Sequence, residues 1–191
     1  TTGVSHAIMA GQITPSNLFT VRLDSAMLEL LRSLPLKNAD TIFSAVAAKL
    51  GSIGVTLMPA STFMEPFMPQ PGVLTKRGPT DSENADIAAG MKIATTISSL
   101  DIGQTLVMKS GTVIAVEAFE GTNQAILRAG KLAGKATVVV KVAKHGHDMR
   151  FDIPVVGQDT IRTLYKAGAS ALAIEAGRSI VLEREIVIKL A

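Results

Sequence analysis

The stretch that most constrains the fold runs from Lys135 to Thr160, where an apolar segment turns directly into a dense run of charge. Residues 137–142, TVVVKV, are rich in β-branched side chains and predict a buried strand. Seven ionisable residues lie within twelve positions at its end: Lys141, Lys144, His145, His147, Asp148, Arg150 and Asp152. Open α/β sheets bind ligands outside the carboxyl ends of their strands, so this junction predicts a ligand site. The alternative is a solvated loop, but such loops usually carry scattered Lys and Glu.

The composition restricts the class of protein. Of 191 residues, 47% are hydrophobic and 18% are charged, which is typical of a folded chain with a large core. Without cysteine there are no disulfides and no Cys-ligated zinc, which is compatible with a cytoplasmic location. The net charge of +3 suits phosphate-bearing ligands or an anionic membrane surface. One Tyr and no Trp argue against nucleic acid as a partner.

Changes of pattern divide the chain into two α/β domains and a linker. Residues 1–58 predict the remainder of a Rossmann-like α/β domain, of which we expect the beginning to be missing. Residues 59–79 hold five of the eight prolines and predict a linker, because proline continues neither a helix nor a central strand. Residues 80–191 predict a carboxy-terminal catalytic domain with a mixed sheet, and its last helical pattern suggests that this end is cut as well.

Local signals place the elements within these domains. Ser25 and Asn38 are the predicted caps of two helices in the first domain. Thr80-Asp81-Ser82-Glu83 is a capping box that predicts a helix through Ser99. Ser110-Gly111 predicts the tight turn of a hairpin. Residues 5–13 predict a strand followed by a loop. The remaining expectations are strands at 55–58, 170–175 and 180–182, and helices at 125–131, 159–167 and 183–190.

Charged residues that follow predicted strands indicate phosphoryl chemistry. The acidic ones are Glu117, Glu120, Asp148, Asp152 and Glu175, and the basic ones are Lys141, Lys144 and Arg150. Carboxylate oxygens suit Mg²⁺, and cationic side chains offset the charge that builds up on phosphate oxygens. The residue types alone leave open whether a given carboxylate binds metal or acts as a general base. His145-x-His147 could form a metal pair, but a structural or phosphate-binding role is favoured because no third histidine lies nearby.

Three segments of the second domain carry a family resemblance. DIGQTLVMKSGTVIAVEAFEGT, KVAKHGHDMRFDIPVVGQDT and ALAIEAGRSIVL occur in this order, after PGVLTKRGPTDSENADIAAG. Together they resemble the carboxy-terminal domain of the LpxI-type UDP-2,3-diacylglucosamine pyrophosphatases, and the residues before Met58 resemble the end of that family's amino-terminal domain. The resemblance implies an Mg²⁺-dependent hydrolase of lipid A biosynthesis. It would cleave a nucleotide glycolipid, UDP-2,3-diacylglucosamine, to lipid X and UMP, with water attacking the phosphorus nearer the sugar.

The same resemblance implies roles for individual residues. The Arg-x-Asp-hydrophobic-Pro motif stands at 150–154 and makes Asp152 the main catalytic and metal-binding candidate. Asp148 and Glu117 are further catalytic candidates, and Glu120 is a second candidate metal ligand. The candidate substrate-binding residues are Lys141, Lys144, Arg150, His147, Gln104, Gly121, Thr122 and Thr160. The sequence departs from the family pattern at His147, where Gln is expected, and at Asn123, where Asp is expected.

Two other readings of the chain remain at this point. The first is a non-catalytic binding module for a phosphorylated sugar, a nucleotide or a glycolipid. The second is a purely structural domain, which the charged strand ends disfavour. Contact with the inner membrane is expected to be peripheral, since no apolar run reaches the roughly 18 residues of a membrane span. The oligomeric state stays open, with a homodimer among the alternatives.

Overall fold

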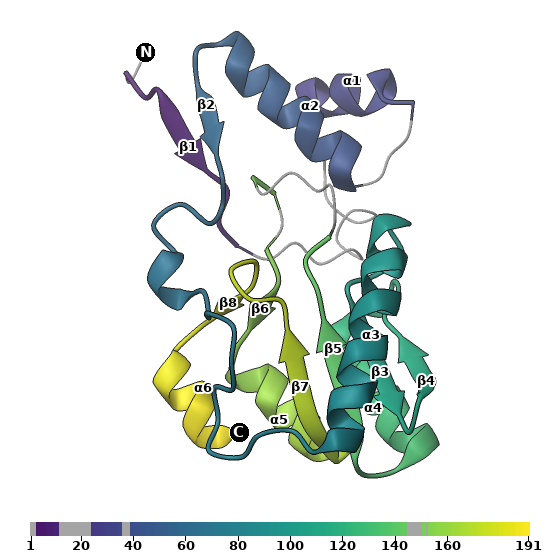
Figure 1. Ribbon diagram of the computed structural model, residues 1–191. Coiled ribbons are helices and arrows are strands. Elements are labelled where there is room, and N and C mark those ends of the chain that lie inside the picture. The colour runs from purple at the N-terminus through teal and green to yellow at the C-terminus, as the bar shows by residue number, and fades with distance from the viewer. Residues whose placement is uncertain (1–2, 12–23, 36–38, 145–149, 152) are drawn as a thin grey trace. The chain divides into compact units, whose positions relative to one another are not determined.

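The computed structural model describes residues 3–11, 24–35, 39–144, 150–151 and 153–191. The chain divides into two compact units, one of residues 1–62 with 147–152 and the other of residues 63–146 with 153–191. Both units combine helices with strands (Figure 1), which confirms the predicted α/β class. The chain passes from the first unit to the second between Thr62 and Phe63, inside the predicted linker.

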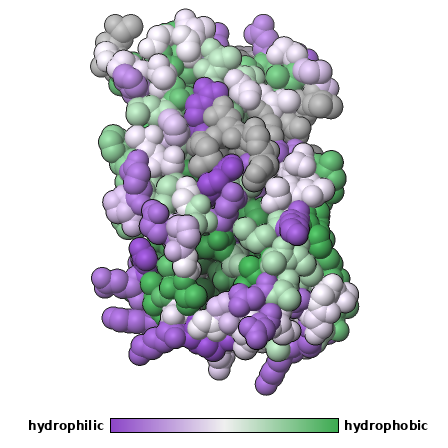
Figure 2. All heavy atoms as spheres, viewed as in Figure 1, coloured by the Kyte–Doolittle hydropathy of each residue, from purple (hydrophilic) through white to green (hydrophobic). Residues whose placement is uncertain are grey.

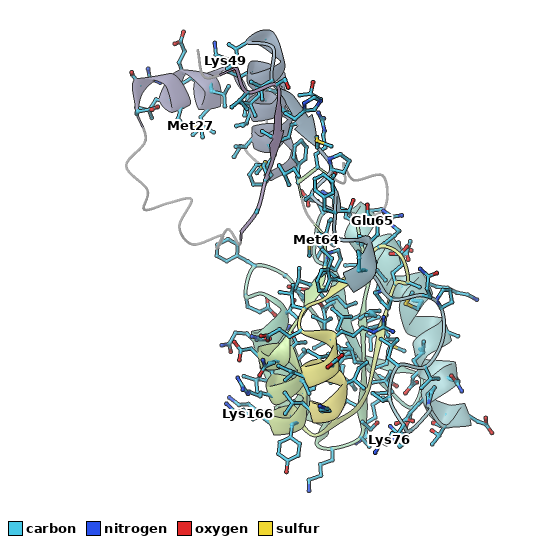
Figure 3. The ribbon with its side chains drawn as sticks, turned by 90° about the vertical axis from the view of Figure 1, so that its left-hand side faces the viewer. Met27, Lys49, Met64, Glu65, Lys76 and Lys166 are labelled. Atoms are coloured by element: carbon cyan, nitrogen blue, oxygen red, sulfur yellow. The ribbon has the colours of Figure 1, made fainter. Side chains whose placement is uncertain are left out.

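The first unit contains a parallel pair of strands joined by helices. Strand β1 (His6–Ile8) pairs in parallel with β2 (Thr56–Met58), in a register that places His6 opposite Thr56. Helices α1 (Ser25–Ser33) and α2 (Ala39–Ser52) lie between them in sequence. Met27 on α1 and Lys49 on α2 are labelled in Figure 3. A parallel pair requires such a crossover, because a tight turn cannot bring the chain back in the same direction.

Helix α1 corrects one predicted cap. The cap is Asp24 and not Ser25: its carboxylate accepts a hydrogen bond from the Met27 amide at 2.8 Å. Asp and Ser are about equally good caps, so the residue types could not decide between neighbouring positions. The other predicted cap, Asn38, lies outside the described residues.

The linker contains a 3₁₀ turn, and an ion pair between Arg77 and Glu83 lies at its end. The turn, η2 (Glu65–Phe67), has Pro66 in its first positions, and Figure 3 shows Met64 and Glu65 at its start. Further on, the Arg77 guanidinium donates twice to the Glu83 carboxylate, at 2.8 and 3.1 Å, and also to the Ser170 carbonyl oxygen. Arg77 therefore ties the end of the linker to helix α3 (Asp81–Ser99) and to strand β7 (Ala169–Ile174).

Helix α3 (Asp81–Ser99) begins at the predicted capping box. The Thr80 hydroxyl accepts from the Glu83 amide, and the Glu83 carboxylate accepts from the Thr80 amide at 2.8 Å. The helix packs closely on the sheet at Gly90, where an added Cβ would lie 2.8 Å from a methyl group of Val140. The predicted start and end of this helix are both confirmed.

A mixed four-stranded sheet forms the centre of the second unit. Its strands are β3 (Thr105–Lys109), β4 (Thr112–Val116), β5 (Thr137–Lys141) and β7 (Ala169–Ile174), in the order β4-β3-β5-β7. Strand β3 is antiparallel to β4 and β5, whereas β5 and β7 are parallel. The predicted Ser110-Gly111 turn is confirmed, with positive φ angles of 49° and 78°. Its amides donate to the buried Asp86 carboxylate at 2.9 and 2.6 Å.

The remaining elements follow β5 or lie between the sheet strands. They are α4 (Thr122–Ala133), β6 (Val155–Val156), α5 (Gln158–Ala167), β8 (Ile180–Val181) and α6 (Arg184–Leu190). Strands β6 and β8 form a separate parallel pair. The sequence analysis missed β6, because two residues directly after Pro154 are too few for a pattern to show.

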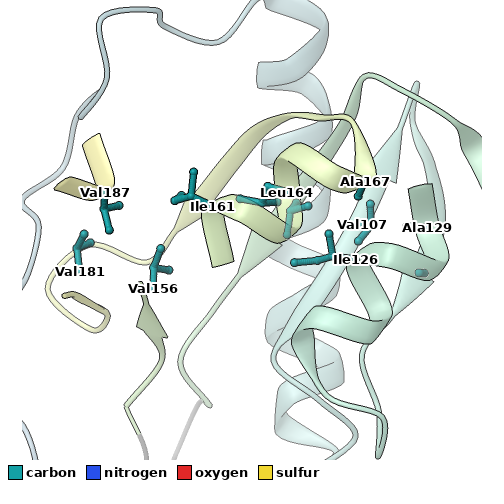
Figure 4. Close-up of a cluster of buried hydrophobic side chains, with 11 residues drawn as sticks. Val107, Ile126, Ala129, Val156, Ile161, Leu164, Ala167, Val181 and Val187 are labelled. Atoms are coloured by element: carbon teal, nitrogen blue, oxygen red, sulfur yellow. The ribbon is translucent and has the colours of Figure 1, made fainter. Parts of the chain in front are cut away.

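Alternation along the strands separates two cores. Leu106, Met108, Val138 and Val140 face one side and pack with Ala94 of α3. Residues on the other side pack with α4, α5 and α6 in the cluster of Figure 4, which includes Val107, Ile126, Val139, Leu164 and Val187. Successive strand residues point to opposite faces, so a run such as VVV can serve both cores.

The outer edge of the sheet keeps some apolar surface. Figure 2 shows hydrophobic side chains over the part of the second unit where β7 lies in Figure 1, above a mostly hydrophilic lower rim. Strand β7 is an edge strand, and all six of its residues are partly exposed. Among the described residues, no helix combines the length and the apolar character needed to cross a membrane.

Candidate functional site

The polar residues of the site gather at one end of the sheet, where β4, β5 and β7 end and β3 begins. We call this end of the strands the sheet edge of the site. The register places Thr105, the first residue of β3, opposite Lys141, the last residue of β5. Lys141 also pairs with Ile174, the last residue of β7. Strand β4 ends at this edge too, so Glu117 directly after it and Glu175 directly after β7 come to the same place. The topology thus brings together residues that are up to 70 positions apart in the sequence, Thr105 and Glu175 among them.

A buried chain of hydrogen bonds links a lysine to a glutamate at this edge. Lys141 is 8% exposed, and its Nζ donates to the hydroxyl oxygens of Thr122 at 2.8 Å and of Thr105 at 3.4 Å. The Thr122 hydroxyl donates to Glu117 Oε1 at 2.8 Å. The other carboxylate oxygen, Glu117 Oε2, is buried and has no hydrogen-bond partner within the described part of the chain. A buried acceptor without a partner is costly, so this oxygen is suited to a ligand or a cation.

Glycine at position 103 allows this arrangement. A Cβ added there would lie 2.1 Å from the carbonyl oxygen of Glu117, so the segment before β3 presses against the Glu117 backbone. The φ of Gly103 is not positive, so close approach to Glu117, and not a left-handed backbone, is what excludes a side chain there.

Glu120 and Gly121 stand at the start of α4. The Glu120 carboxylate accepts from the Arg128 guanidinium and from the Ala118 amide. The hydrogen bond from Arg128 holds the pKa of the Glu120 carboxyl below its usual range. Gly121 is the cap of α4 and has a φ of 82°, a conformation that glycine adopts readily. The structure thus places Glu120, a predicted metal ligand, in an ion pair with Arg128.

A second cation lies just beyond β5. Lys144 Nζ is 2.7 Å from Asp101 Oδ1, and the Lys144 side chain is 12% exposed. Asp101 has a positive φ of 60°, which is uncommon for a residue with a side chain. The predicted substrate residue Gln104 accepts from the Val142 amide through its backbone carbonyl oxygen at 3.0 Å. These contacts place Lys141 and Lys144 on the chain leaving β5, three residues apart.

The other predicted site residues divide between the two units and the undescribed positions. His147, Asp148 and Asp152 lie outside the described residues. Arg150 belongs to the first unit, with its guanidinium carbon 5.2 Å from the centre of the Phe151 ring. Thr160 lies in the first turn of α5, and no hydrogen bond or ion pair links it to Lys141 or Glu117 in the described regions.

Within the described ranges, no three His, Asp or Glu side chains gather as a metal site would require. The unpartnered oxygen of Glu117 supplies one ligand of the kind that Mg²⁺ prefers. Glu120 would have to leave Arg128 to supply another. Glu117 Oε2 could therefore fill one coordination position of a magnesium ion.

Two residues of the site were not among those predicted. Thr105 binds Lys141 through a hydroxyl at the start of β3, and its signal is visible only once the register of β3 and β5 is known. Arg178 lies in the loop after β7, and its guanidinium donates to the Lys144 carbonyl oxygen at 3.2 Å. A single Arg beyond a strand carries no pattern in the sequence.

Known proteins are similar to this chain over almost its whole length. The model of the LpxI C-terminal domain matches residues 70–191, and that of the LpxI N-terminal domain matches residues 1–67. The UDP-2,3-diacylglucosamine pyrophosphatase LpxI of Caulobacter vibrioides is 30% identical, with 97% of this chain and 70% of that protein covered. The resemblance on which the sequence analysis rests is thereby confirmed, and the chain belongs to the LpxI family.

Proposed function

We propose that this protein hydrolyses the pyrophosphate of UDP-2,3-diacylglucosamine to UMP and 2,3-diacylglucosamine 1-phosphate (lipid X) in lipid A biosynthesis. The observation that carries the proposal is the buried Lys141–Thr122–Glu117 chain at the sheet edge of a member of the LpxI family. It sets a cation, a hydroxyl and a carboxylate oxygen without a partner among the described residues side by side. The activity named for the Caulobacter relative supports the choice of substrate.

The reaction replaces one oxygen on the phosphorus nearer the sugar. Water attacks that phosphorus, and the bond to the bridging oxygen breaks. The bridging oxygen leaves with UMP, and the oxygen of water stays in the lipid phosphate. Negative charge increases on the leaving phosphate, so cations held nearby in a partly buried site lower the barrier.

Particular residues carry the steps of the proposal. Lys141 and Lys144 bind the diphosphate, with Arg150 as a third cation. Thr122 orients Lys141 and Glu117 by accepting from one and donating to the other. Glu117 and Asp152 are the proposed carboxylates for metal or for the attacking water, and Asp148 is the proposed partner of Asp152.

We propose magnesium as the cofactor, with Glu117 Oε2 as one of its ligands. Asp152 and Glu120 remain the ligands that the family resemblance implies. When bound, Mg²⁺ would neutralise charge on the diphosphate oxygens. The support within the described residues is the buried oxygen of Glu117, which has no hydrogen-bond partner among them.

The lipid part of the substrate implies a location. We propose that the protein acts in the cytoplasm with peripheral contact to the inner membrane, and that residues 80–191 form the catalytic domain. The apolar surface near β7 supports contact with acyl chains or with lipid (Figure 2).

The test is direct turnover followed by mass spectrometry. Purified protein is incubated with UDP-2,3-diacylglucosamine in ¹⁸O-labelled water, with Mg²⁺ or with a chelator. The proposal expects UMP without the label and lipid X with one labelled oxygen, and loss of both products with the chelator. Glu117→Gln should remove turnover, whereas the matched change Asp159→Asn, on a carboxylate that is 86% exposed, should not.

The alternative outcome is equally clear. Tight binding of UDP-2,3-diacylglucosamine, with no products formed in the presence of any metal ion, would identify a non-catalytic binding module. Labelled oxygen in UMP would still show hydrolysis, but with water attacking the other phosphorus.

A further inference from the structure

Two residues of the loop between β7 and β8 hold the chain that leaves β5. The Ala143 amide donates to Glu175 Oε2 at 2.9 Å. The Arg178 guanidinium donates to the Lys144 carbonyl oxygen at 3.2 Å. Arg178 Nε lies 3.7 Å from Glu175 Oε1, which closes a ring of contacts around the Ala143–Lys144 peptide. We call this ring the 175–178 clasp.

The clasp completes a series of restraints on consecutive residues. Just before it, the Val142 amide donates to the Gln104 carbonyl oxygen at 3.0 Å. Val142 and Ala143 are 0% and 1% exposed, so the backbone here is held in a buried position. Three residues in a row are thus fixed by segments from before β3 and after β7. A loop that served only to connect two strands would not need this.

The residue at the end of this series is Lys144. Its ammonium group meets Asp101 at 2.7 Å, and its side chain is 12% exposed, although a free lysine side chain samples many rotamers. The direction of the side chain depends on the peptide from which it starts. The clasp holds the backbone at the Ala143 amide and at the Lys144 carbonyl, so it restricts the direction in which the Lys144 side chain starts.

We propose that Glu175 and Arg178 are positioning residues, which act on catalysis through Lys144. The inference rests on the proposed function, in which Lys144 binds the substrate diphosphate. A cation held in place before the reaction stabilises developing charge without a further cost of ordering. Loss of the clasp leaves the lysine present but misplaced.

A double-mutant cycle tests whether Arg178 acts through Lys144. Arg178→Ala should lower kcat/KM for UDP-2,3-diacylglucosamine by about 10- to 100-fold. In a Lys144→Met background, the same change should lower it by less than about twofold, because the group being positioned is gone. Equal losses in both backgrounds would show that Arg178 acts independently of Lys144, and the proposal would then be wrong.

Conservative variants separate positioning from loss of charge. Glu175→Gln keeps an oxygen acceptor for the Ala143 amide and should retain more activity than Glu175→Ala. The matched control is Asp159 with Arg162, which are also three positions apart and ion-paired, at 3.0 Å, but on an exposed surface. Asp159→Asn and Arg162→Ala should leave kcat/KM unchanged. Equal activity of the two Glu175 variants would contradict the proposed grip on the amide.

A measurement without substrate distinguishes failure of this inference from failure of the proposed function. In protein labelled with ¹³C at the lysine ε-carbons, the Lys144 signal is assigned by its disappearance in Lys144→Met. Arg178→Ala should shift this signal toward that of an exposed lysine, and Arg162→Ala should not. An unmoved Lys144 signal would overturn the positioning role even if turnover is found. A shifted signal with no turnover by the wild type would overturn the function and keep the clasp.

Discussion

The rings of Phe43 and Phe151 lie 5.7 Å apart at an angle of 32°, within the first unit. Phe43 belongs to α2, whereas Phe151 comes from a segment more than a hundred positions later. Phe151 stands between Arg150 and Asp152, two residues of the motif to which the family resemblance gives the main catalytic role. One aromatic contact therefore connects a helix of the amino-terminal unit to that motif.

Phe43→Ala should weaken this connection. The lost ring contact is expected to cost the first unit about 1 kcal/mol beyond the loss of buried area. Since Phe151 adjoins Arg150, the KM for UDP-2,3-diacylglucosamine should also rise several-fold. Steady-state kinetics and thermal unfolding measure both effects. Ile53→Ala is the control, because Ile53 is in the same unit and 68% exposed, and its truncation should change neither. An unchanged KM in Phe43→Ala would show that the contact serves stability alone.

Lys141→Met should nearly abolish turnover while the protein stays folded. Met retains most of the apolar length of a side chain that is 8% exposed, but it cannot donate to Thr122 or Thr105. Loss of one charge-stabilising donor typically lowers kcat by about 100- to 1,000-fold. Circular dichroism of the wild type and the variant checks folding, and the rate of product formation gives kcat. A wild-type kcat in Lys141→Met would show that Lys141 has no role in catalysis.

Gly103→Ala should disturb Glu117 through the backbone. The new Cβ would meet the Glu117 carbonyl oxygen at 2.1 Å, so the backbone of one segment has to move. We expect a stability loss of about 1–3 kcal/mol, as for other overpacked positions, together with a lower kcat. Gly157→Ala is the matched control: it lies in the same unit, and a Cβ there meets nothing within 4 Å. Denaturant titration of both variants makes the comparison, and equal stabilities would contradict the close approach.

The Glu83 carboxyl should make stability depend on pH in acid. The hydrogen bond from Arg77, with others from Ser170 and Thr80, lowers the pKa of Glu83 from 4.5 to about 2 in the folded state. The contribution of the ionised carboxylate is therefore complete above about pH 4.5 and is lost as the pH falls toward 2. Glu83→Gln should cost about 1–2 kcal/mol near neutral pH, the range for a cap and an ion pair together.

The difference between wild type and Glu83→Gln is the quantity to follow. It should shrink between about pH 4.5 and pH 2, because a protonated Glu83 and the glutamine that replaces it are both neutral. Urea unfolding at several pH values measures it. A difference that stays constant over this range would show that the carboxylate is not stabilised by its charge.

Local sequence patterns were enough to predict several helices and turns of the second unit. The capping box at Thr80 and the Ser110-Gly111 turn depend on neighbouring residues alone, and both are confirmed. The ligand site expected beyond Val142 remains a prediction, but the structure does bring Lys141, Lys144 and Glu117 to one sheet edge, as the strand ends indicated. The resemblance then supplied the family, which composition could not.

What the sequence could not show depends on contacts between distant residues. The role of Thr105 follows from its register opposite Lys141, and that of Gly103 from its approach to Glu117. Strand β6 exists because β8 pairs with it, and two valines after Pro154 carry no period of their own. Asp24 replaced Ser25 as a cap because neighbouring capping residues compete on nearly equal terms.

The assignment of residues 147–152 to the first unit has a consequence for the way this protein can be divided. Neither unit is a continuous length of chain, since the polypeptide leaves the second unit after Gly146 and re-enters it at Ile153. Expression of residues 63–191 alone would leave Phe151 without Phe43. Exchange of the amino-terminal portion with that of a relative would likewise separate helix α2 from the segment it packs against. A chimera that is to keep the first unit intact must therefore take Phe43 and Phe151 from the same parent.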